Sequence, residues 1–402
     1  MPDSTAVRAF LTDSHLAQAA RVTEYAAQEL VSLPEPQDDA AARAQARELL
    51  ARLGQAGWFA PIGDLDLRAA CLVREALAAA SPLADAVFAL QALGTVPILL
   101  AGDRELKNRW VPAALAGQAM ASFALTEAEA GSDAAAIATT ARRDGAGYVL
   151  AGTKTFISNA GIADFYTVFA STDPTRGNKG ISAFVVAADA PGLTFVRPLV
   201  LSAPHPLGEI AFQDCRVPAS SRLGAEGEGF KLGLATLDRL RATVAAAACG
   251  MAARALHEAV GHATRRRQFG RTLAEFQLIQ EKLARMATDL TAARLLTYRA
   301  AWEKDRGAER VTLEAAMAKA FATEAAQRIV DDAVQILGGR GVLASHPVDR
   351  LYRAVRALRI YEGTTEIQHL IVAEQLLKRA AGAVCESSWW AAGRPASTSR
   401  SR

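Results

Sequence analysis

The chain has 402 residues, of which 51% are hydrophobic and 22% are charged. This length is enough for two or three domains with a large core, and the composition is that of an ordinary globular protein. The formal net charge of +3 is too small to indicate a nucleic-acid-binding protein, and the basic run Arg265–Arg267 is a patch rather than a nucleic-acid footprint.

The cysteine positions and the first residues indicate the kind of compartment in which the protein would work. The cysteines are widely scattered, without a CxxC pair or a Cys/His cluster, at Cys71, Cys215, Cys249 and Cys385. They predict neither a metal site nor a disulfide framework, and they fit a reducing, cytoplasmic setting. The first residues lack a basic stretch followed by an apolar one, so we expect no signal peptide. Because no run of 18 apolar residues is free of charge, we expect no membrane span.

The first 120 residues are rich in Ala and Leu with Glu and Arg interleaved. This texture predicts helices, with breaks near Leu33–Pro36, Pro61 and Pro82.

The residue pattern changes between residues 121 and 228. Turn residues at Asp144-Gly145 and Pro191-Gly192 separate short runs that favour strands. These runs are Tyr148–Leu150, Tyr166–Phe169, Ala183–Val186, Leu193–Val196 and Ile210–Phe212. We therefore expect an antiparallel β domain.

Longer helical patterns follow from about residue 229. Thr272 and Glu275 have capping-box spacing, and apolar residues then recur every three or four positions up to Ala293. A further helix is expected over Thr312–Leu337, ending at Gly338-Gly339. A last helix should begin at Thr365, where Thr365–Gln368 again has capping-box form.

The order helical, β, helical predicts an α+β protein and argues against a doubly wound sheet. We expect an N-terminal helical domain (residues 1–120), a middle antiparallel β domain (121–228), a C-terminal helical bundle (229–382) and a disordered tail (383–402). GxGxxG does not occur, and Gly147–Lys154 resembles a P-loop only with its Lys one place late. A dinucleotide would therefore not lie in a Rossmann unit.

Four segments carry the candidate chemistry. They are Phe123–Asp133 (FALTEAEAGSD), Gly152–Gly161 (GTKTFISNAG), Arg266–Gly270 (RRQFG) with Phe276-Gln277 just after it, and Gln335–Gly339 (QILGG) followed by Ile360–Gln368 (IYEGTTEIQ). Their order and spacing resemble the acyl-CoA dehydrogenase family over nearly the whole chain, most weakly before residue 80 and in the tail. The resemblance implies bound FAD and removal of two hydrogens across the α–β bond of an acyl thioester.

The first two segments are similar to the family's flavin-contacting loops. Small residues and hydroxyls such as Thr126 and Gly131 let a backbone approach a flat ring and a diphosphate. By resemblance, Phe156 covers the isoalloxazine and the Ser158 hydroxyl reaches the N5 region; Phe156 replaces the commoner Trp, and Ser158 the commoner Thr. Ala128 stands where the family usually has Pro. A polar turn after an edge strand and an ordinary core aromatic are the alternative interpretations.

The third and fourth segments imply a shared site. By resemblance, Arg266, Gln268 and Gln335–Gly339 approach the FAD diphosphate and adenine from a neighbouring subunit, so the chain would form a homo-oligomer, as the family's homotetramers do. A guanidinium suits a diphosphate because it donates in a fixed fork, although a solvated helix end is the alternative. The full implied set of cofactor-binding residues is Phe123, Leu125, Thr126, Gly131, Ser132, Phe156, Ile157, Ser158, Arg266, Gln268, Phe269, Gln277, Gln335, Gly338, Gly339, Thr364 and Glu366.

Glu362 is the candidate base. Alone, a Glu before a helix is usually an exposed carboxylate favoured by the helix dipole. The full motif reverses this interpretation, since the family's Glu at this place projects toward the flavin and removes the α proton. The position that carries the base in some relatives is Leu240 here, which cannot abstract a proton.

The resemblance also implies a set of substrate-binding residues: Ser132, His205, Asp238, Arg241 and Gly363. A helix-surface arginine is the alternative for Arg241. His205 stands where relatives usually have a Ser that contacts the CoA arm. It belongs either to a Pro-stiffened surface loop or to altered recognition of a bulky, aromatic or carrier-protein thioester. Ala354 replaces a usual Asp, without an interpretation from the sequence.

Three functions follow as hypotheses. The first is an acyl-CoA dehydrogenase that passes electrons to an electron-transfer flavoprotein. The second keeps the fold as an acyl-CoA oxidase, a carrier-protein-thioester dehydrogenase or a monooxygenase-like member. The third is a non-catalytic scaffold with vestigial flavin binding, which Glu362 and the small net charge disfavour.

Overall fold

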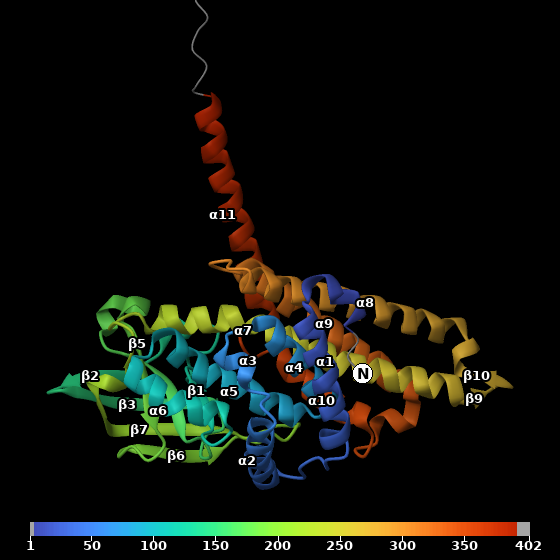
Figure 1. The fold of residues 1–402 in the computed structure, drawn as a ribbon, viewed down its shortest axis with the longest axis horizontal. Coiled ribbons are helices and arrows are strands. Elements are labelled where there is room, and N and C mark those ends of the chain that lie inside the picture. Colours follow the sequence, from blue (N-terminus) through green and yellow to red (C-terminus); the bar gives the residue numbers. More distant parts are fainter. Residues whose placement is uncertain (1–3, 392–402) are drawn as a thin grey trace, which may run out of the picture.

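The computed structural model describes residues 4–391. Figure 1 shows a helical region and a β-sheet at one end, and long helices that extend to the other end. The order along the chain is helical, β, helical, which confirms the predicted α+β class.

The N-terminal region consists of helices joined by short turns. Asp38, Asp66, Ser81 and Asp103 each accept a hydrogen bond from a backbone N–H of the first turn that follows them, which stabilises the helix start. The breaks fall near Leu33–Pro36, Pro61 and Pro82, as predicted. The helices are α1 (Asp13–Tyr25), α2 (Asp39–Gln55), α3 (Ala60–Gly63), α4 (Leu67–Ala80), α5 (Pro82–Ala101) and α6 (Arg104–Leu115).

Helix α5 is the most apolar of these N-terminal helices and is long enough to be compared with a membrane span. Its length and mean hydropathy of 1.8 would allow it to cross a membrane, since Asp85 is its only charged residue. However, 78% of the apolar window is buried inside the protein. Its Ile98 packs with Phe165 and Phe169 of the sheet, so the helix serves as a core element here.

The middle region is one eight-stranded sheet in the order β6-β7-β3-β2-β4-β5-β8, with β1 paired to β4. Every strand-prone run of the sequence lies in a strand. The sheet is mainly antiparallel, but β1–β4 and β2–β4 pair in parallel, which the sequence did not predict. The strands are β1 (Ala121–Ala124), β2 (Thr140–Asp144), β3 (Gly147–Ser158), β4 (Phe165–Ser171), β5 (Ile181–Ala187), β6 (Leu193–Pro198), β7 (Leu207–Pro218) and β8 (Arg222–Leu223).

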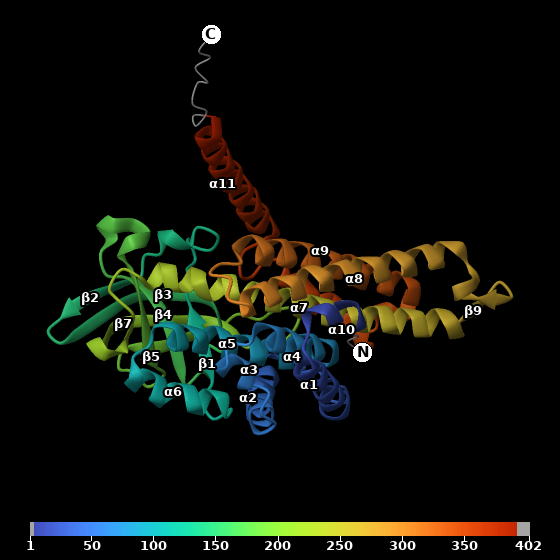
Figure 2. The same cartoon turned by 45° about the horizontal axis from the view of Figure 1, so that its top comes forward.

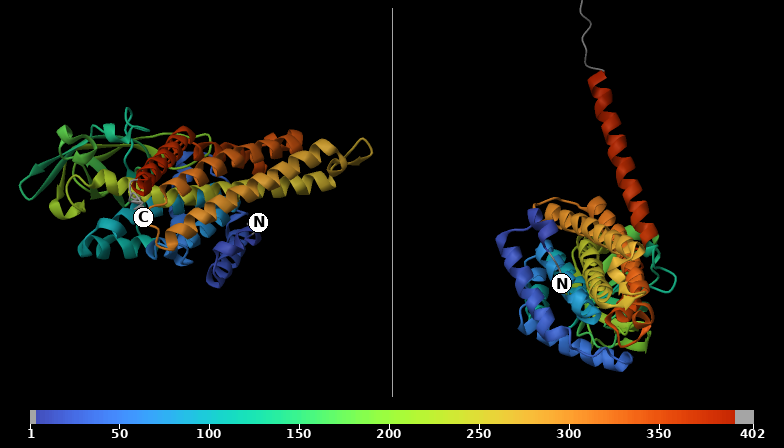
Figure 3. Two further views of the ribbon diagram at one scale, coloured as in Figure 1. Left: turned by 90° about the horizontal axis from the view of Figure 1, so that it is seen from above. Right: turned by 90° about the vertical axis from the view of Figure 1, so that its right-hand side faces the viewer.

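Helix α7 (Gly229–Arg265) connects the sheet to the far end of the molecule. Its 37 residues span about 55 Å at 1.5 Å per residue. It begins against β5, where a Cβ on Gly229 would lie 2.3 Å from the Ser182 carbonyl carbon. It ends at the hairpin of β9 (Arg267–Gln268) and β10 (Arg271–Thr272), and the left-hand view of Figure 3 shows this hairpin projecting away from the sheet.

The remaining helices are α8 (Gln277–Asp305), α9 (Thr312–Leu337), α10 (Pro347–Leu358) and α11 (Thr365–Ala391). The capping box at Thr272 is present, with Glu275 bound to the Thr272 backbone N–H, although it closes a short 3-10 turn before α8. Met286, Leu290 and Ala293 of α8 are buried along the predicted apolar face. Helix α9 ends at Gly338, which has a φ of 60°, as expected for a glycine stop.

At the C-terminus, α11 begins at Thr365 as expected, but its capping and its length differ from the expectation. Thr364, not Thr365, caps α11 by accepting the Ile367 N–H at 3.4 Å, whereas the Thr365 hydroxyl donates to Glu324. Helix α11 also continues through Ala391, past Ala383, where we expected order to end. It projects from the bundle (Figure 2), and the rest of the predicted tail lies outside the described residues.

Candidate active site

Glu362 lies in the turn between α10 and α11, as the sequence indicated. Its backbone is in the left-handed region, with a φ of 56°, and Gly363 follows with a φ of 93°. A Cβ on Gly363 would lie 2.5 Å from the Gln368 side-chain nitrogen, so the position requires glycine. Gln368 Nε2 donates to both turn carbonyls, that of Glu362 at 3.2 Å and that of Gly363 at 3.0 Å. An unfavourable backbone conformation is thus fixed by hydrogen bonds from the following helix.

Arg241 of α7 secures the same turn. Its Nε donates to the Glu362 carbonyl at 3.2 Å, and its Nη1 lies 2.6 Å from Asp238 Oδ1. Asp238 also accepts the Thr312 hydroxyl at 2.7 Å. Arg241 is buried, so the interpretation as a surface arginine was wrong. Its neighbour Leu240 packs in the N-terminal core and offers no basic group.

Lys319 is a site residue that the sequence analysis missed. It lies on α9, is fully buried, and its Nζ donates to the Gly363 carbonyl at 2.7 Å. Burial lowers the pKa of Lys319 to about 8, against the opposing effect of the Glu362 carboxylate. The only sequence signal is a lysine on the apolar face of the predicted helix.

The Glu362 carboxyl is itself strongly perturbed. Among the described residues, its Oε2 atom is buried and has no hydrogen-bond partner. Burial raises the pKa of Glu362 above its ordinary value, although Arg74, Arg241 and Lys319 oppose this shift. A carboxylate that costs free energy to bury and carries a raised pKa is typical of a general base.

The loop after β1 is anchored by a buried ion pair that the sequence analysis also missed. Lys154 Nζ lies 2.7 Å from Glu127 Oε1 and 3.0 Å from the Leu125 carbonyl. Glu127 further accepts the N–H groups of Ala138 and Thr139, at 2.6 and 3.0 Å. Burial lowers the pKa of Lys154 to about 8, and the pKa of Glu127 lies below its ordinary value because Lys154 and Thr139 outweigh its burial, so both are charged at neutral pH. The pair holds the first segment against β3.

The second segment follows directly in β3. The Thr155 N–H donates to the Thr126 carbonyl at 3.0 Å, so the first two predicted flavin segments do lie side by side. The β3–β7 register shifts between Lys154 and Ile157, and within this bulge Phe156 has a φ of 54°. Its side chain is 60% exposed. A bulge that turns an aromatic ring outward leaves a flat apolar face for a ligand.

Other residues of these segments differ in how they could contact a cofactor. Gly131 and Ser132 are exposed, and a Cβ on Gly131 would meet nothing within 4 Å. In contrast, the Ile157 side chain lies in the sheet core, so it could contact a cofactor only through its backbone. Phe123 packs against Phe169 with ring centroids 4.8 Å apart, which assigns its side chain to the core. Leu125 is partly buried in the same core.

His205 lies beside Ser158. Its Nε2 is 2.8 Å from Ser158 Oγ, across the end of the β3–β7 pair. Burial, with a contribution from the nearby Arg43, lowers the pKa of His205 to about 4. The ring is therefore neutral at pH 7, and the loop that carries it is joined to the predicted flavin segment.

The third segment lies far from these residues within one chain. Arg266, Gln268, Phe269 and Gln277 are exposed at the hairpin end, and Phe269 is 93% exposed with a φ of 51°. Gln335, Gly338 and Gly339 are also exposed, at the end of α9. Arg340 lies close enough to His262 and Arg266 for their charges to act together, so the two groups share one end of the molecule. Thr364 and Glu366 lie elsewhere, at the start of α11.

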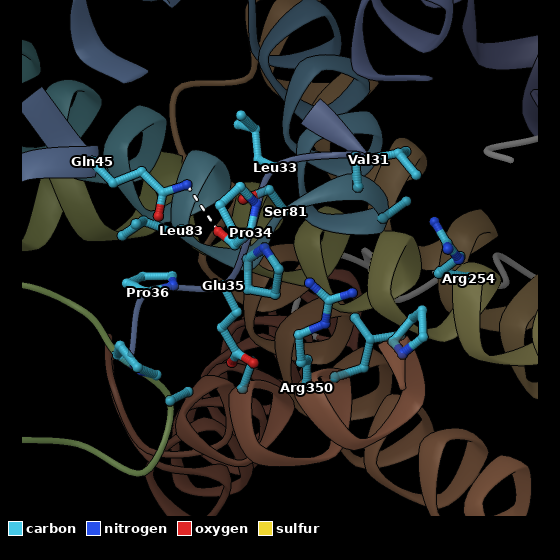
Figure 4. A pocket seen from close by; sticks show the side chains of 18 residues that line it. Val31, Leu33, Pro34, Glu35, Pro36, Gln45, Ser81, Leu83, Arg254 and Arg350 are labelled. Carbon is cyan, nitrogen blue, oxygen red and sulfur yellow. Dashed lines mark hydrogen bonds between the residues drawn. The ribbon is translucent and has the colours of Figure 1, made fainter. Parts of the chain in front are cut away.

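Two surface pockets adjoin the His205 loop. The first, of about 60 Å³, lies between residues 31–36, the start of α5, and α10; Figure 4 shows Gln45 bound to the Pro34 carbonyl, and Arg254 and Arg350 at its edge. Ala354 lines it, so the missing Asp leaves room there. The second, of about 450 Å³, includes His205, Asp39 and Arg353. Neither pocket is lined by Glu362, Phe156 or Ser158.

Models of three domains match the chain in sequence: acyl-CoA dehydrogenase N-terminal domain over residues 12–118, middle domain over 122–215, and C-terminal domain over 227–377. The chain belongs to the acyl-CoA dehydrogenase family. It is an oxidoreductase whose family cofactor is FAD and whose family reaction is dehydrogenation.

Relatives of this acyl-CoA dehydrogenase agree. The mitochondrial short-chain specific acyl-CoA dehydrogenase of Bos taurus is 49% identical over 285 residues, which cover 70% of this chain and 69% of the relative. The 3-(aryl)acrylate reductase of Clostridium sporogenes is 40% identical over 380 residues, 92% of this chain and all of the relative. The structure of butyryl-CoA dehydrogenase from Megasphaera elsdenii has a TM-score of 0.85 at 34% identity, over 91% of this chain and 99% of that one.

The described residues fit FAD. The exposed Phe156, the open Gly131 and the anchored loop of Glu127 offer an aromatic face and free backbone next to the Ser158 hydroxyl. When bound, FAD would supply a two-electron acceptor there.

Proposed function

We propose that the chain oxidises an acyl-CoA thioester to the 2-enoyl thioester, with Glu362 as the base. The Glu362 carboxylate would take the α proton, and bound FAD would supply the acceptor for the β hydrogen and its electron pair. The observation that carries this proposal is the Glu362 Oε2 atom, which is buried and has no hydrogen-bond partner in the part of the chain that the structure describes; Arg241, Lys319 and Gln368 fix its turn. A base without competing hydrogen bonds, held in one place, is suited to proton abstraction.

We further propose a homo-oligomer, on the model of the family's tetramers. Two observations support it. The hairpin that carries Arg266 lies at the end of the molecule away from the sheet that carries Phe156 (Figure 1), so we expect one FAD to meet both sets only with a second subunit. Helix α11 projects from the bundle with Leu370 and Leu377 exposed, as expected for a helix that packs on a partner.

The proposals for the electron acceptor and the cellular compartment rest on the family resemblance. We propose that an electron-transfer flavoprotein takes the electrons, and that the enzyme works in the cytoplasm. Cys71, Cys215 and Cys249 are buried and unpaired in the described chain, which fits a reducing compartment. An aromatic acyl group is the second candidate substrate, because a relative at 40% identity is named for 3-arylacrylates.

The deciding experiment has three steps on one preparation. The purified protein should be yellow and release FAD on denaturation. A panel of short, long, branched and aromatic acyl-CoA thioesters, mixed anaerobically, should bleach the flavin band with the good substrates. Air should then reoxidise the flavin slowly, whereas fast reoxidation would indicate an oxidase. A colourless protein that FAD does not reconstitute would contradict the proposal.

A further inference from the structure

The contact between His205 and Ser158 joins a residue that departs from the resembled motif to the predicted flavin segment. Ser158 is the last residue of β3 and pairs with Leu207 of β7. His205 precedes that pair by two positions, and its Nε2 lies 2.8 Å from Ser158 Oγ. The Ser158 carbonyl accepts the Ser122 hydroxyl at 2.7 Å, so the backbone that carries Ser158 is also held from β1.

The loop around His205 is fixed from several sides. The Asn159 N–H donates to the Pro206 carbonyl at 2.9 Å. Arg43 of α2 donates to the carbonyls of Ala160 and, at 2.8 Å, of Leu207. Pro204 and Pro206 flank the histidine and restrict the backbone further. An incidental surface histidine would not be expected to have its loop joined to β3, which carries the predicted flavin segment, in this way.

The protonation state of the His205 ring determines whether it donates a hydrogen bond to Ser158 Oγ or accepts one from it. The fall in the pKa of His205 leaves a neutral imidazole, which has one N–H donor and one acceptor nitrogen. If Nε2 carries the proton, it donates to Ser158 Oγ, and the Ser158 O–H remains free to donate to a ligand. If Nε2 is unprotonated, it accepts the hydrogen bond from the Ser158 O–H, which is then no longer free to donate to a ligand. The two tautomers therefore have opposite effects at the same distance.

We propose that His205 is a positioning residue that donates to Ser158 Oγ and so directs the Ser158 O–H toward the flavin. This inference rests on the proposed function and on the family resemblance, which implies that the Ser158 hydroxyl reaches the flavin N5 region. The Nε2–H tautomer is assigned because an oxidised flavin nitrogen requires a donor. His205 then sets the redox balance of the flavin and does not select the acyl group directly.

A double-mutant cycle tests this on the FAD-loaded oligomer without substrate. The flavin midpoint potential is measured for the wild type, His205→Phe, Ser158→Ala and the double variant. We expect each single change to shift the ratio of oxidised to reduced flavin about threefold to tenfold, in the same direction, which is about 15 to 30 mV for a two-electron couple. The double variant should match Ser158→Ala alone, because His205 acts only through that hydroxyl.

Two matched variants complete the design. His205→Gln keeps an N–H donor at a similar reach, so it should restore most of the wild-type potential. Ser202→Ala changes an exposed side chain of the same loop, keeps its backbone carbonyl, and should leave the potential unchanged. If His205→Phe does not fold, the comparison of His205→Gln with His205→Ser gives the same test, because the serine is too short to reach Ser158 Oγ.

Additive shifts, or a wild-type potential in the histidine variants, would overturn the inference. A changed preference among acyl thioesters with an unchanged potential would also overturn it, in favour of direct substrate recognition by His205. Both outcomes would leave the proposed function standing, since flavin and substrate bleaching would persist. A protein that holds no FAD would overturn the inference and the proposed function together.

Discussion

The turn at Glu362 and the hairpin at Phe269 both contain a non-glycine residue with a positive φ, at 56° and 51°. In the first, Arg241, Lys319 and Gln368 from three helices hold the backbone, and the Glu362 Oε2 atom is buried. In the second, Phe269 is 93% exposed at the end of the molecule. Its ring meets Phe276 at a centroid distance of 6.2 Å.

The difference indicates which part of the site one chain completes alone. The Glu362 turn has its backbone partners within the chain, so the base can be positioned before any partner binds. The hairpin presents exposed Arg266 and Phe269 side chains, and we expect a cofactor or a second subunit to supply their further contacts. Variants of the first region should therefore change chemistry, and variants of the second should change assembly and cofactor retention.

The largest expected effect is that of Glu362→Gln. Anaerobic flavin reduction by a good thioester should fall at least about a hundredfold, the low end for losing a positioned general base. FAD should stay bound, because no flavin contact is removed. Oxidation of chemically reduced flavin by its acceptor should be unchanged. Near-normal bleaching on mixing would mean that another group removes the α proton, and Leu240 could not be that group.

Arg266→Ala should affect the other region. Losing a charge-assisted contact to a diphosphate should weaken FAD retention about tenfold or more. Because the proposed site is shared, the oligomer should dissociate at higher protein concentration in the same variant, measured by analytical ultracentrifugation. Arg265→Ala is the matched control, one position earlier and equally exposed. If both variants retain FAD and dissociate to the same extent, Arg266 does not contact the FAD diphosphate as proposed.

The sequence predicted most of the fold because its signals were local. Proline breaks, the Gly338 stop and the strand-prone runs each act within a few residues, and the structure confirms them. The parallel pairing of β1 with β4 was not predictable in this way, since it joins Ala121–Ala124 to Phe165–Val168 across an intervening hairpin. The end of α11 was also misjudged, because a polar tail composition does not show where a helix stops.

Some residues of the candidate site could likewise be predicted from the sequence, and others could not. Glu362 and Arg241 followed from a resemblance in motif, and the structure brings them together. Lys319 and Lys154 were missed because a buried lysine is indistinguishable from a surface lysine in one sequence. Their partners, the Gly363 carbonyl and Glu127, lie 44 and 27 residues away. Only the tertiary contact gives these lysines a function.

Lys319→Met tests whether the Glu362 turn needs its cation. The variant loses the hydrogen bond to Gly363 and a positive charge near the base, which should reduce the rate of flavin reduction about threefold to tenfold. The pH at which the rate reaches half of its maximum should rise, because Lys319 helps to keep the pKa of Glu362 down. Lys282→Met, which removes a half-buried lysine paired with Asp332 on the bundle, is the control. A lower rate with an unmoved pH profile would restrict Lys319 to holding the backbone.

The smallest expected effect is on stability. Burial raises the pKa of Glu362, so between its unfolded value of about 4.3 and its folded value the native state keeps a proton that the unfolded chain has lost. The stability that this proton gives is complete below the unfolded value and is lost as pH rises through the folded one. Glu362→Gln should therefore be more stable than the wild type at pH 8, by on the order of 1 kcal/mol, and show little gain near pH 4.

The cations near Glu362 should not reverse this result. Arg74 keeps Asp85 at 2.7 Å, and Arg241 keeps Asp238 at 2.6 Å, so removing the Glu362 charge leaves neither arginine without a carboxylate. Urea unfolding at matched protein and FAD concentrations would measure the difference at both pH values. A variant that is less stable than the wild type at pH 8 would show that Glu362 serves mainly as a counter-charge to Lys319. The Glu362 turn would then differ from the hairpin because it contains a buried ion pair, and not because it holds a carboxylate ready to accept a proton.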